Sequence, residues 1–128
     1  MSNEFKKLDN GKTRWDLLPV DALEAVAQVL TFGVHKYGDD NWRSGNPDHN
    51  RIQASLLRHY RDYKKGIDLD SESGMPHLAH MATNAIFLLE YHLNNVGNDN
   101  RFIYSKQVTA PTMFVPEGYN VISVKGNK

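Results

Sequence analysis

The stretch from His77 to Leu89, HLAHMATNAIFLL, decides how this chain folds, because its apolar residues recur with helical spacing and its only ionisable side chains are histidines. A helix of this composition is expected to be buried. Burying His77, His80 and Asn84 costs free energy unless each polar group finds a partner. That partner could be another side chain, a metal ion or a bound ligand.

Two further helices are expected before this one. The first begins around residues 17–19, where a proline suits the first turn, and ends at Gly33 or continues to Gly38. Its expected apolar positions are Leu23, Val26, Ala27 and Leu30. The second covers about 51–65, and the third about 76–95. The core-facing stripe of the second helix consists of Ile52, Leu56, His59 and Tyr63.

The chain changes character after Gly97. Residues 102–124 are rich in β-branched and aromatic residues but are interrupted by Pro111, Pro116 and Gly118, which predicts one or two short strands or an extended arm. The expected fold is therefore an all-α helical bundle in residues 1–97. Residues 98–128 form a β-like or extended C-terminal arm that is not an independent domain and packs on the bundle or on a second subunit.

The composition excludes several classes of protein. The chain has 128 residues, which suggests one domain, and its 15 basic and 15 acidic residues give no indication of a nucleic-acid polymer or an anionic membrane as partner. It has no cysteine, which excludes disulfides, thiolate zinc sites and cysteine nucleophiles. The polar N-terminus does not resemble a signal peptide, and no apolar run is long enough to span a bilayer. We expect a soluble, cytoplasmic protein.

The third helix offers the strongest candidate site. His77, Met81, Asn84 and Leu88 share one narrow stripe, with His80 one step to the side, so a polar site is expected at one end and a dry core at the other. His59 on the second helix is expected to join the histidines. Histidines on facing helices can hold a metal inside a bundle. The alternative is that these histidines are core residues bonded to the backbone or to acidic side chains.

Acidic side chains in two segments could complete a metal site. Asp68, Asp70 and Glu72 lie in the loop before the third helix, and their oxygens suit a hard cation. The alternative is that such residues cap the helix, an interpretation that fits Glu72 and Ser73 best.

The first helix carries an acidic pair of its own. Asp21 and Glu24 form a D-x-x-E pair on the same helical face as Gln28 and Thr31. They could be metal-binding carboxylates that face the histidine helix. The alternative is an ordinary solvated polar face.

The segment FGVHKYGDDNW, residues 32–42, contains candidate substrate contacts. Lys36 could bind phosphate, as could Arg58 on the second helix, while Trp42 or Tyr37 could stack on a base and Asn41 could contact a base edge. Alternatively, Trp42 anchors the loop to the bundle and Lys36 is merely exposed. The chain contains no Walker-type loop, no G-x-S-x-G and no Rossmann fingerprint.

Two segments together resemble a known family. They are GKTRWDLLPVDALEAVAQVLTFGVHKYGDDNW, residues 11–42, and LLRHYRDYKKGIDLDSESGMPHLAHMATNAIFLL, residues 56–89. The order and spacing of these segments, and short motifs in them such as KYG..NW, DLDSESG and HLAH, resemble those of a phage and bacterial domain. This domain is known as the N-terminal domain of dATP/dGTP diphosphohydrolase. This domain is grouped with the MazG-like, all-α nucleoside triphosphate pyrophosphohydrolases.

The resemblance, which covers about residues 10–93, implies a helical bundle that is dimeric or larger. It implies hydrolysis of a nucleoside triphosphate, of the purine deoxynucleotide type, to monophosphate and pyrophosphate with Mg²⁺ or Mn²⁺. It places Asp21 and Glu24 where the superfamily has its first pair of carboxylates, and His77 and His80 where it has the second. Histidine ligands favour Mn²⁺ or another transition metal, unless Asp70 and Glu72 supply the oxygens.

We therefore expect a phage nucleotide-pool enzyme. Its expected catalytic residues are Glu24, His59, His77 and His80. Its expected metal ligands are Asp21, Glu24, Asp70 and Glu72, and its expected substrate contacts are Lys36, Asn41, Trp42, Arg58 and Asn84.

Two rival functions remain at this point. The first is a binding protein without catalysis, in which a phage sponge sequesters a nucleotide-derived defence signal. The shortage of paired acids favours it. The second is an HD-type phosphohydrolase, which is disfavoured because the adjacent H-D dipeptide of that class is absent.

Overall fold

The computed structural model describes residues 3–107 and 109–122. In chain order these contain the 3₁₀ helix η1 (Trp15–Leu17), α1 (Val20–Tyr37), the 3₁₀ helix η2 (Asn41–Arg43), α2 (His49–Lys64) and α3 (His77–Asn94). The prediction of an all-α fold with three main helices is confirmed. The observed bounds of α2 and α3 lie within two residues of the expected ones.

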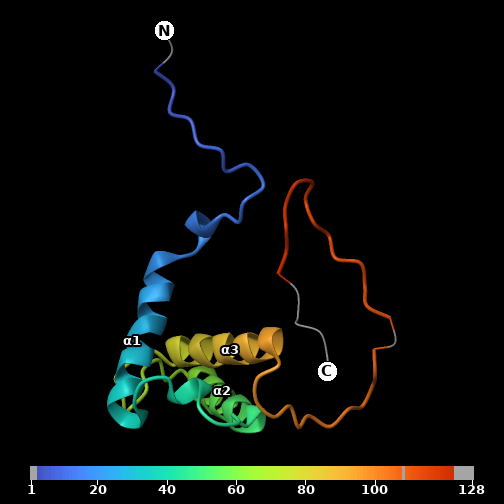
Figure 1. The fold of residues 1–128 in the computed structure, drawn as a ribbon. Coiled ribbons are helices and arrows are strands. Elements are labelled where there is room, and N and C mark those ends of the chain that lie inside the picture. The colour runs from blue at the N-terminus through green and yellow to red at the C-terminus, as the bar shows by residue number, and fades with distance from the viewer. Residues whose placement is uncertain (1–2, 108, 123–128) are drawn as a thin grey trace.

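The helices α2 and α3 form a hairpin, and α1 packs mainly on α3 at one end of this pair. Figure 1 shows α1 running steeply away from the hairpin, so that its N-terminal half projects beyond the other two helices. The connection from α1 to α2 and the connection from α2 to α3 both pass close to the C-terminal half of α1. This half of α1 therefore helps to form the functional region.

The ends of the helices follow from local chemistry. The helix α1 ends at Gly38, whose φ of 86° is readily adopted only by glycine, so of the two expected ends Gly38 is correct and Gly33 is wrong. Asp48 caps the start of α2, where its carboxylate accepts a hydrogen bond of 3.0 Å from the backbone N–H of Asn50.

The expected apolar face of α1 is only partly correct. Val26 is buried, as expected, and Val29 is buried beside it, but Leu23 and Ala27 are exposed. The helix also begins later than expected, because Trp15–Leu17 forms a 3₁₀ turn and α1 starts at Val20. The physical reason for the exposure of Leu23 is that it lies near the N-terminal end of α1, which projects beyond the other two described helices.

The arm after residue 97 is extended in its described part. Within residues 3–107 and 109–122 no strand forms, and only two isolated bridges occur, Asp48 with Asn98 and Leu69 with Pro76. The strand alternative for residues 102–124 is therefore wrong over their described part, and residues 123–124 lie outside the described residues. Pro111 and Pro116 cannot donate to a ladder of hydrogen bonds, and no second strand is available there for pairing.

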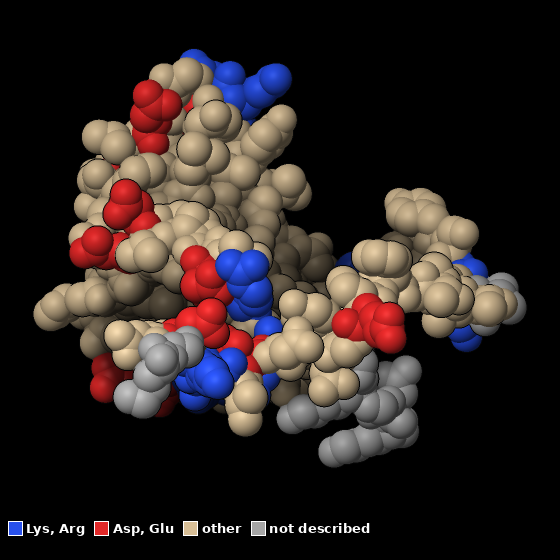
Figure 2. Space-filling model, turned by 90° about the horizontal axis from the view of Figure 1, so that it is seen from above, with Lys and Arg blue, Asp and Glu red and all other residues tan. Residues whose placement is uncertain are grey.

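The core is small and unusually polar. Among the described residues, the buried apolar side chains are Val26, Val29, Ala79 and Tyr91, and the buried polar ones are His49, His77, Thr83 and Asn84. Much of the face drawn in Figure 2 is uncharged, with acidic and basic side chains mixed near its centre. Among the described residues, no helix has the length and apolar character needed to cross a membrane.

Candidate metal centre and nucleotide cavity

Three histidines converge where α2 packs on the start of α3. The Nδ1 atoms of His59 and His77 lie 2.8 Å apart, a hydrogen-bond distance, and the rings of His59 and His80 are stacked with centroids 4.4 Å apart. His77 is only 3% exposed. The three histidines that were expected to lie together therefore do so, although His59 belongs to α2 and the other two belong to α3.

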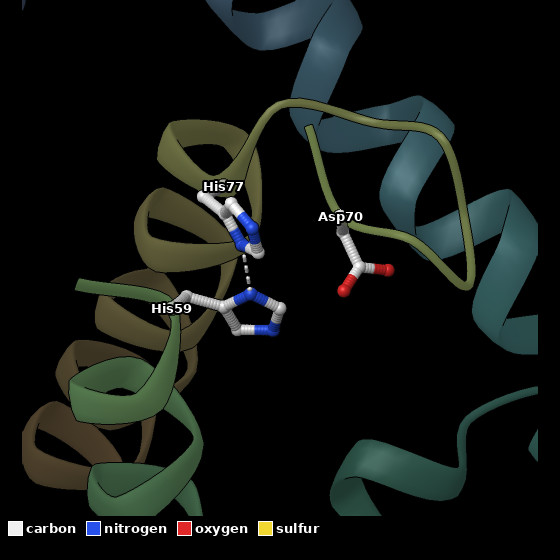
Figure 3. A group of neighbouring side chains, drawn as sticks. All are labelled: His59, Asp70 and His77. Carbon is white, nitrogen blue, oxygen red and sulfur yellow. Dashed lines mark hydrogen bonds between the residues drawn. The ribbon is translucent and has the colours of Figure 1, made fainter. Parts of the chain in front are cut away.

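A carboxylate faces this group from the loop between α2 and α3. The potential ligand atoms of His59, Asp70 and His77 all lie within 4.8 Å of one another, and Figure 3 shows the Asp70 carboxylate opposite the two imidazoles. The Asp70 Oδ2 atom accepts hydrogen bonds from the backbone N–H and the hydroxyl of Ser73, at 2.8 and 2.9 Å. The Oδ1 atom therefore keeps its lone pairs for another ligand.

Ser73 connects Asp70 to the third histidine. Its hydroxyl donates to Asp70 and lies 2.7 Å from His80 Nε2, so His80 donates its Nε2 hydrogen to the Ser73 oxygen. This leaves the Nδ1 atom of His80 unprotonated and basic. The loop is held closed by Gly74, whose backbone N–H bonds the carbonyl of Asp70 and whose φ of +72° favours glycine.

The expected capping role of Ser73 and Glu72 is wrong. The helix α3 starts after Pro76 with no side-chain cap. Ser73 instead bonds Asp70 and His80, and Glu72 forms an ion pair of 2.5 Å with Lys36 at the end of α1. Both residues therefore form contacts with other segments of the chain and do not cap the helix.

Burial and neighbouring charge favour the metal-binding forms of these groups. Burial and the nearby imidazoles lower the pKa of His59 and of His80. Burial alone would raise the pKa of Asp70, but the hydrogen bonds from Ser73 and the nearby imidazoles outweigh it and hold the pKa of Asp70 below its ordinary value. Both shifts in histidine pKa favour the neutral imidazole and the shift of Asp70 favours the carboxylate, and imidazole nitrogens with a carboxylate oxygen are a donor set that fits a divalent transition metal.

Asp62 is a residue of the site that was not recognised in the sequence. Its carboxylate lies 4.0 Å from His77 Nε2, on the ring edge opposite to the contact with His59. A carboxylate in this place favours a hydrogen on Nε2, so that Nδ1 of His77 is the unprotonated nitrogen and accepts the hydrogen bond from His59. The sequence does contain a pattern that indicates this residue, H-x-x-D from His59 to Asp62. Its spacing puts both side chains on one face of α2.

The other expected metal ligands are not part of this group. Asp21 and Glu24 are exposed on the projecting half of α1, and neither lines the cavity described below. Asp68 is also exposed, and its backbone carbonyl accepts a hydrogen bond from the His77 N–H. Of the expected carboxylate ligands, only Asp70 lies within the cluster in a single copy of the chain.

A cavity of about 1250 Å³ opens beside the histidines, between the C-terminal half of α1, the loop at residues 38–48 and the α2–α3 hairpin. His59, Asp70 and His80 line one end of it. All five expected substrate contacts line it too, namely Lys36, Asn41, Trp42, Arg58 and Asn84. A cavity of this size can hold a ligand as large as a nucleotide.

The far end of the cavity is aromatic. Trp42 stacks on Phe87 with ring centroids 5.4 Å apart, and the Tyr91 hydroxyl donates a hydrogen bond to the carbonyl oxygen of Trp42. The Arg43 guanidinium also lies over the Trp42 ring, 4.4 Å from its centroid. These contacts match the interpretation of Trp42 as the anchor of its loop.

Comparison with known proteins identifies the family of the chain. Residues 2–101 match the family described as dATP/dGTP diphosphohydrolase, N-terminal. A protein of Salmonella phage PMBT28 named dATP/dGTP diphosphohydrolase is 34% identical over 95 residues, which are 74% of this chain and 32% of that protein. The chain thus spans about a third of the length of this relative. No solved structure matches. On this evidence the chain belongs to the dATP/dGTP diphosphohydrolase N-terminal domain family.

Proposed function

We propose that this chain hydrolyses a purine deoxynucleoside triphosphate to the monophosphate and pyrophosphate, with a divalent metal held by His59, Asp70 and His77. The observation that carries the proposal is the convergence of these three ligands within 4.8 Å of one another, two of which, His59 and Asp70, line a nucleotide-sized cavity. The family name, which gives dATP and dGTP as substrates, supports the choice of substrate.

The ligand set indicates which metal is preferred. Two imidazole nitrogens and one carboxylate oxygen suit Mn²⁺ better than Mg²⁺, which prefers oxygen ligands. When bound, the metal would neutralise phosphate charge and lower the pKa of a water molecule. The nitrogens that now share a hydrogen between His59 and His77 would hold the metal, while Asp62 keeps the His77 ring in its orientation.

The protein supplies a base and cations for the reaction. The Nδ1 atom of His80 accepts a proton from the attacking water, because the chain of bonds through Ser73 to Asp70 fixes the hydrogen of this ring on Nε2. Lys36 and Arg58 contact the phosphates. Lys36 must exchange its ion pair with Glu72 for a phosphate, and both of these side chains are exposed enough to move.

A second copy of the chain is expected to complete the enzyme. Asp21 and Glu24 project on α1 beside the exposed apolar side chains Leu17, Val20 and Leu23, which are 69%, 74% and 42% exposed. Exposed apolar side chains gathered at one projecting end of the molecule, here Leu17 of η1 with Val20 and Leu23 of α1, are typical of a protein contact. We propose that this half of α1 packs on a partner subunit and brings Glu24 to the partner's metal centre.

Sequestration of a nucleotide without hydrolysis is the second candidate function. It is favoured by the presence of a single carboxylate among the three clustered ligands. In this case Lys36, Arg58 and the histidines bind the phosphates of a nucleotide-derived signal directly, without a metal.

Incubation of the protein with each of the four deoxynucleoside triphosphates, with Mn²⁺, with Mg²⁺ and with EDTA, tests the proposal. We expect pyrophosphate and monophosphate from dATP or dGTP, faster with Mn²⁺, and none with EDTA or with the His77→Ala variant. Release of inorganic phosphate or triphosphate would contradict the assigned reaction. Tight binding of nucleotide in EDTA without turnover under any condition would favour sequestration.

A further inference from the structure

The register of the α2–α3 hairpin orders three kinds of side chain along the cavity. His59 on α2 contacts His80 on α3, and one turn further along both helices Ser55 contacts Asn84 through a hydrogen bond of 3.1 Å. The aromatic cluster around Phe87 follows in the same direction. Metal ligands, a polar amide–hydroxyl pair and aromatic rings thus follow one another in that order.

The spacing of these groups matches the order of parts in a nucleotide. With a rise of 1.5 Å per residue, Asn84 lies about 6 Å from His80 along the axis of α3, and Phe87 lies about 10 Å from it. In a nucleoside triphosphate the sugar separates the phosphates from the base. If the phosphates bind at the metal centre, the sugar therefore lies at the level of Ser55 and Asn84.

The chemistry of the pair suits a sugar hydroxyl. Asn84 is buried, with 9% of its surface exposed, yet both residues line the cavity. The bond between them uses one Nδ2 hydrogen of Asn84 and one lone pair of Ser55 Oγ. The hydroxyl hydrogen of Ser55 and the Oδ1 oxygen of Asn84 remain as donor and acceptor, and a sugar hydroxyl can pair with both.

We infer that Ser55 and Asn84 bind the 3′-hydroxyl of the nucleotide sugar and make this hydroxyl a requirement for tight binding. The inference rests on the proposed function, because it assumes that the phosphates bind at the metal centre. A site built to bond a hydroxyl rejects an analogue that lacks it, because its own polar groups are then buried without a partner.

The test compares the binding of dATP with that of 2′,3′-dideoxy-ATP, both as α,β-methylene analogues that resist cleavage, by isothermal titration calorimetry in Mn²⁺. We expect the unaltered protein to bind the deoxy compound about tenfold more tightly than the dideoxy compound. Ser55→Ala and Asn84→Leu should reduce this ratio to about one, chiefly by weakening the binding of the deoxy compound.

Asn94→Leu is the matched control. Asn94 lies on the same helix, outside the lining of the cavity, and its side chain bonds the carbonyl of Glu90 within α3. This variant should keep the tenfold ratio. A merely structural role of Ser55 and Asn84 would weaken the binding of both compounds equally and leave the ratio intact, which would overturn the inference.

The outcomes for the inference and for the proposed function are distinct. Equal affinity of the unaltered protein for the two analogues overturns the inference, even if dATP is hydrolysed. A tenfold preference that both cavity variants abolish supports the inference, even if dATP is not hydrolysed. Failure of both analogues to bind overturns the inference together with the proposed nucleotide site.

Discussion

The Nδ1 atoms of His59 and His77 face each other at 2.8 Å, although the two residues belong to different helices. Two nitrogens at this distance share a single hydrogen, so one ring donates and the other accepts. The pair therefore holds α2 against the start of α3 through an interaction that a metal can replace. This relationship motivates the first two predictions.

Replacing His77 by alanine should abolish metal binding and hydrolysis while the helical content is retained. His77 is one of three clustered ligands, so its loss should weaken Mn²⁺ binding by at least about 100-fold. Isothermal titration calorimetry with Mn²⁺ and circular dichroism check the two parts. His92→Ala is the control, because His92 is an exposed histidine of α3 outside the cavity. Loss of helical signal in His77→Ala would instead support a purely structural role for this histidine.

Asp62→Asn should weaken Mn²⁺ binding by about 10- to 100-fold without removing a ligand. The amide retains the shape of the side chain but loses the charge that faces His77 Nε2. Titration of the variant with Mn²⁺ measures the effect. An unchanged affinity would show that the Asp62 carboxylate does not orient the ring.

Glu72→Gln separates two roles for this residue. If Glu72 mainly neutralises Lys36, the variant frees this cation and should bind a triphosphate several-fold more tightly, with unchanged Mn²⁺ affinity. If Glu72 is a metal ligand, the Mn²⁺ affinity should fall instead. Because both side chains of the ion pair are largely exposed, thermal stability should change little in either case.

Glu24→Ala and His77→Ala should complement each other if the site is shared between subunits. Each variant alone is expected to be inactive. Mixing them under conditions that allow subunit exchange should recover part of the activity, because a mixed oligomer contains one intact site. Recovery after exchange, measured as pyrophosphate release, is the expected outcome. An active Glu24→Ala variant would show that the exposed carboxylate of α1 takes no part in the reaction.

Gly97→Ala should destabilise the fold by at least about 2 kcal/mol. Its φ of +82° is strained for alanine, at a cost of about 1–2 kcal/mol. The new methyl group would also meet the carbonyl oxygen of Pro47 and lie 2.8 Å from His49 Nε2. Gly45→Ala is the matched control, with a φ of +67° and open space around the new methyl, so it should show only the backbone cost. Chemical denaturation of the two variants measures the difference.

The stability of the metal-free protein should fall as the pH is lowered below about 6.5. The pKa values of His59 and His80 are lowered in the folded protein from 6.5, chiefly by burial. Below pH 6.5 the unfolded chain therefore binds more protons than the folded one, and acid favours unfolding. Above this pH the two histidines contribute no pH dependence. Melting temperatures between pH 8 and pH 5 test this, and a His80→Gln variant should show a weaker dependence.

The extent of the helices could be predicted from the sequence because it depends on the spacing of apolar residues and on residues at the helix ends. Gly38, which ends α1, and Asp48, which caps α2, are examples. The same spacing placed His59, His77 and His80 on faces that meet. It could not decide which face of α1 is buried, since Leu23 and Val26 are equally apolar and only the packing on α3 distinguishes them. It also could not show that Ser73 bridges Asp70 and His80, because that contact depends on how the loop closes.

All the side chains of the candidate metal centre lie in one continuous piece of chain, from His59 through Asp62 and Asp70 to His80. Contacts this local in sequence need little loop closure, so they form early and rapidly as a chain folds. The helical hairpin should thus be able to gather its ligands before α1 or the arm has docked, and a metal ion present at that stage would favour the folding of the rest.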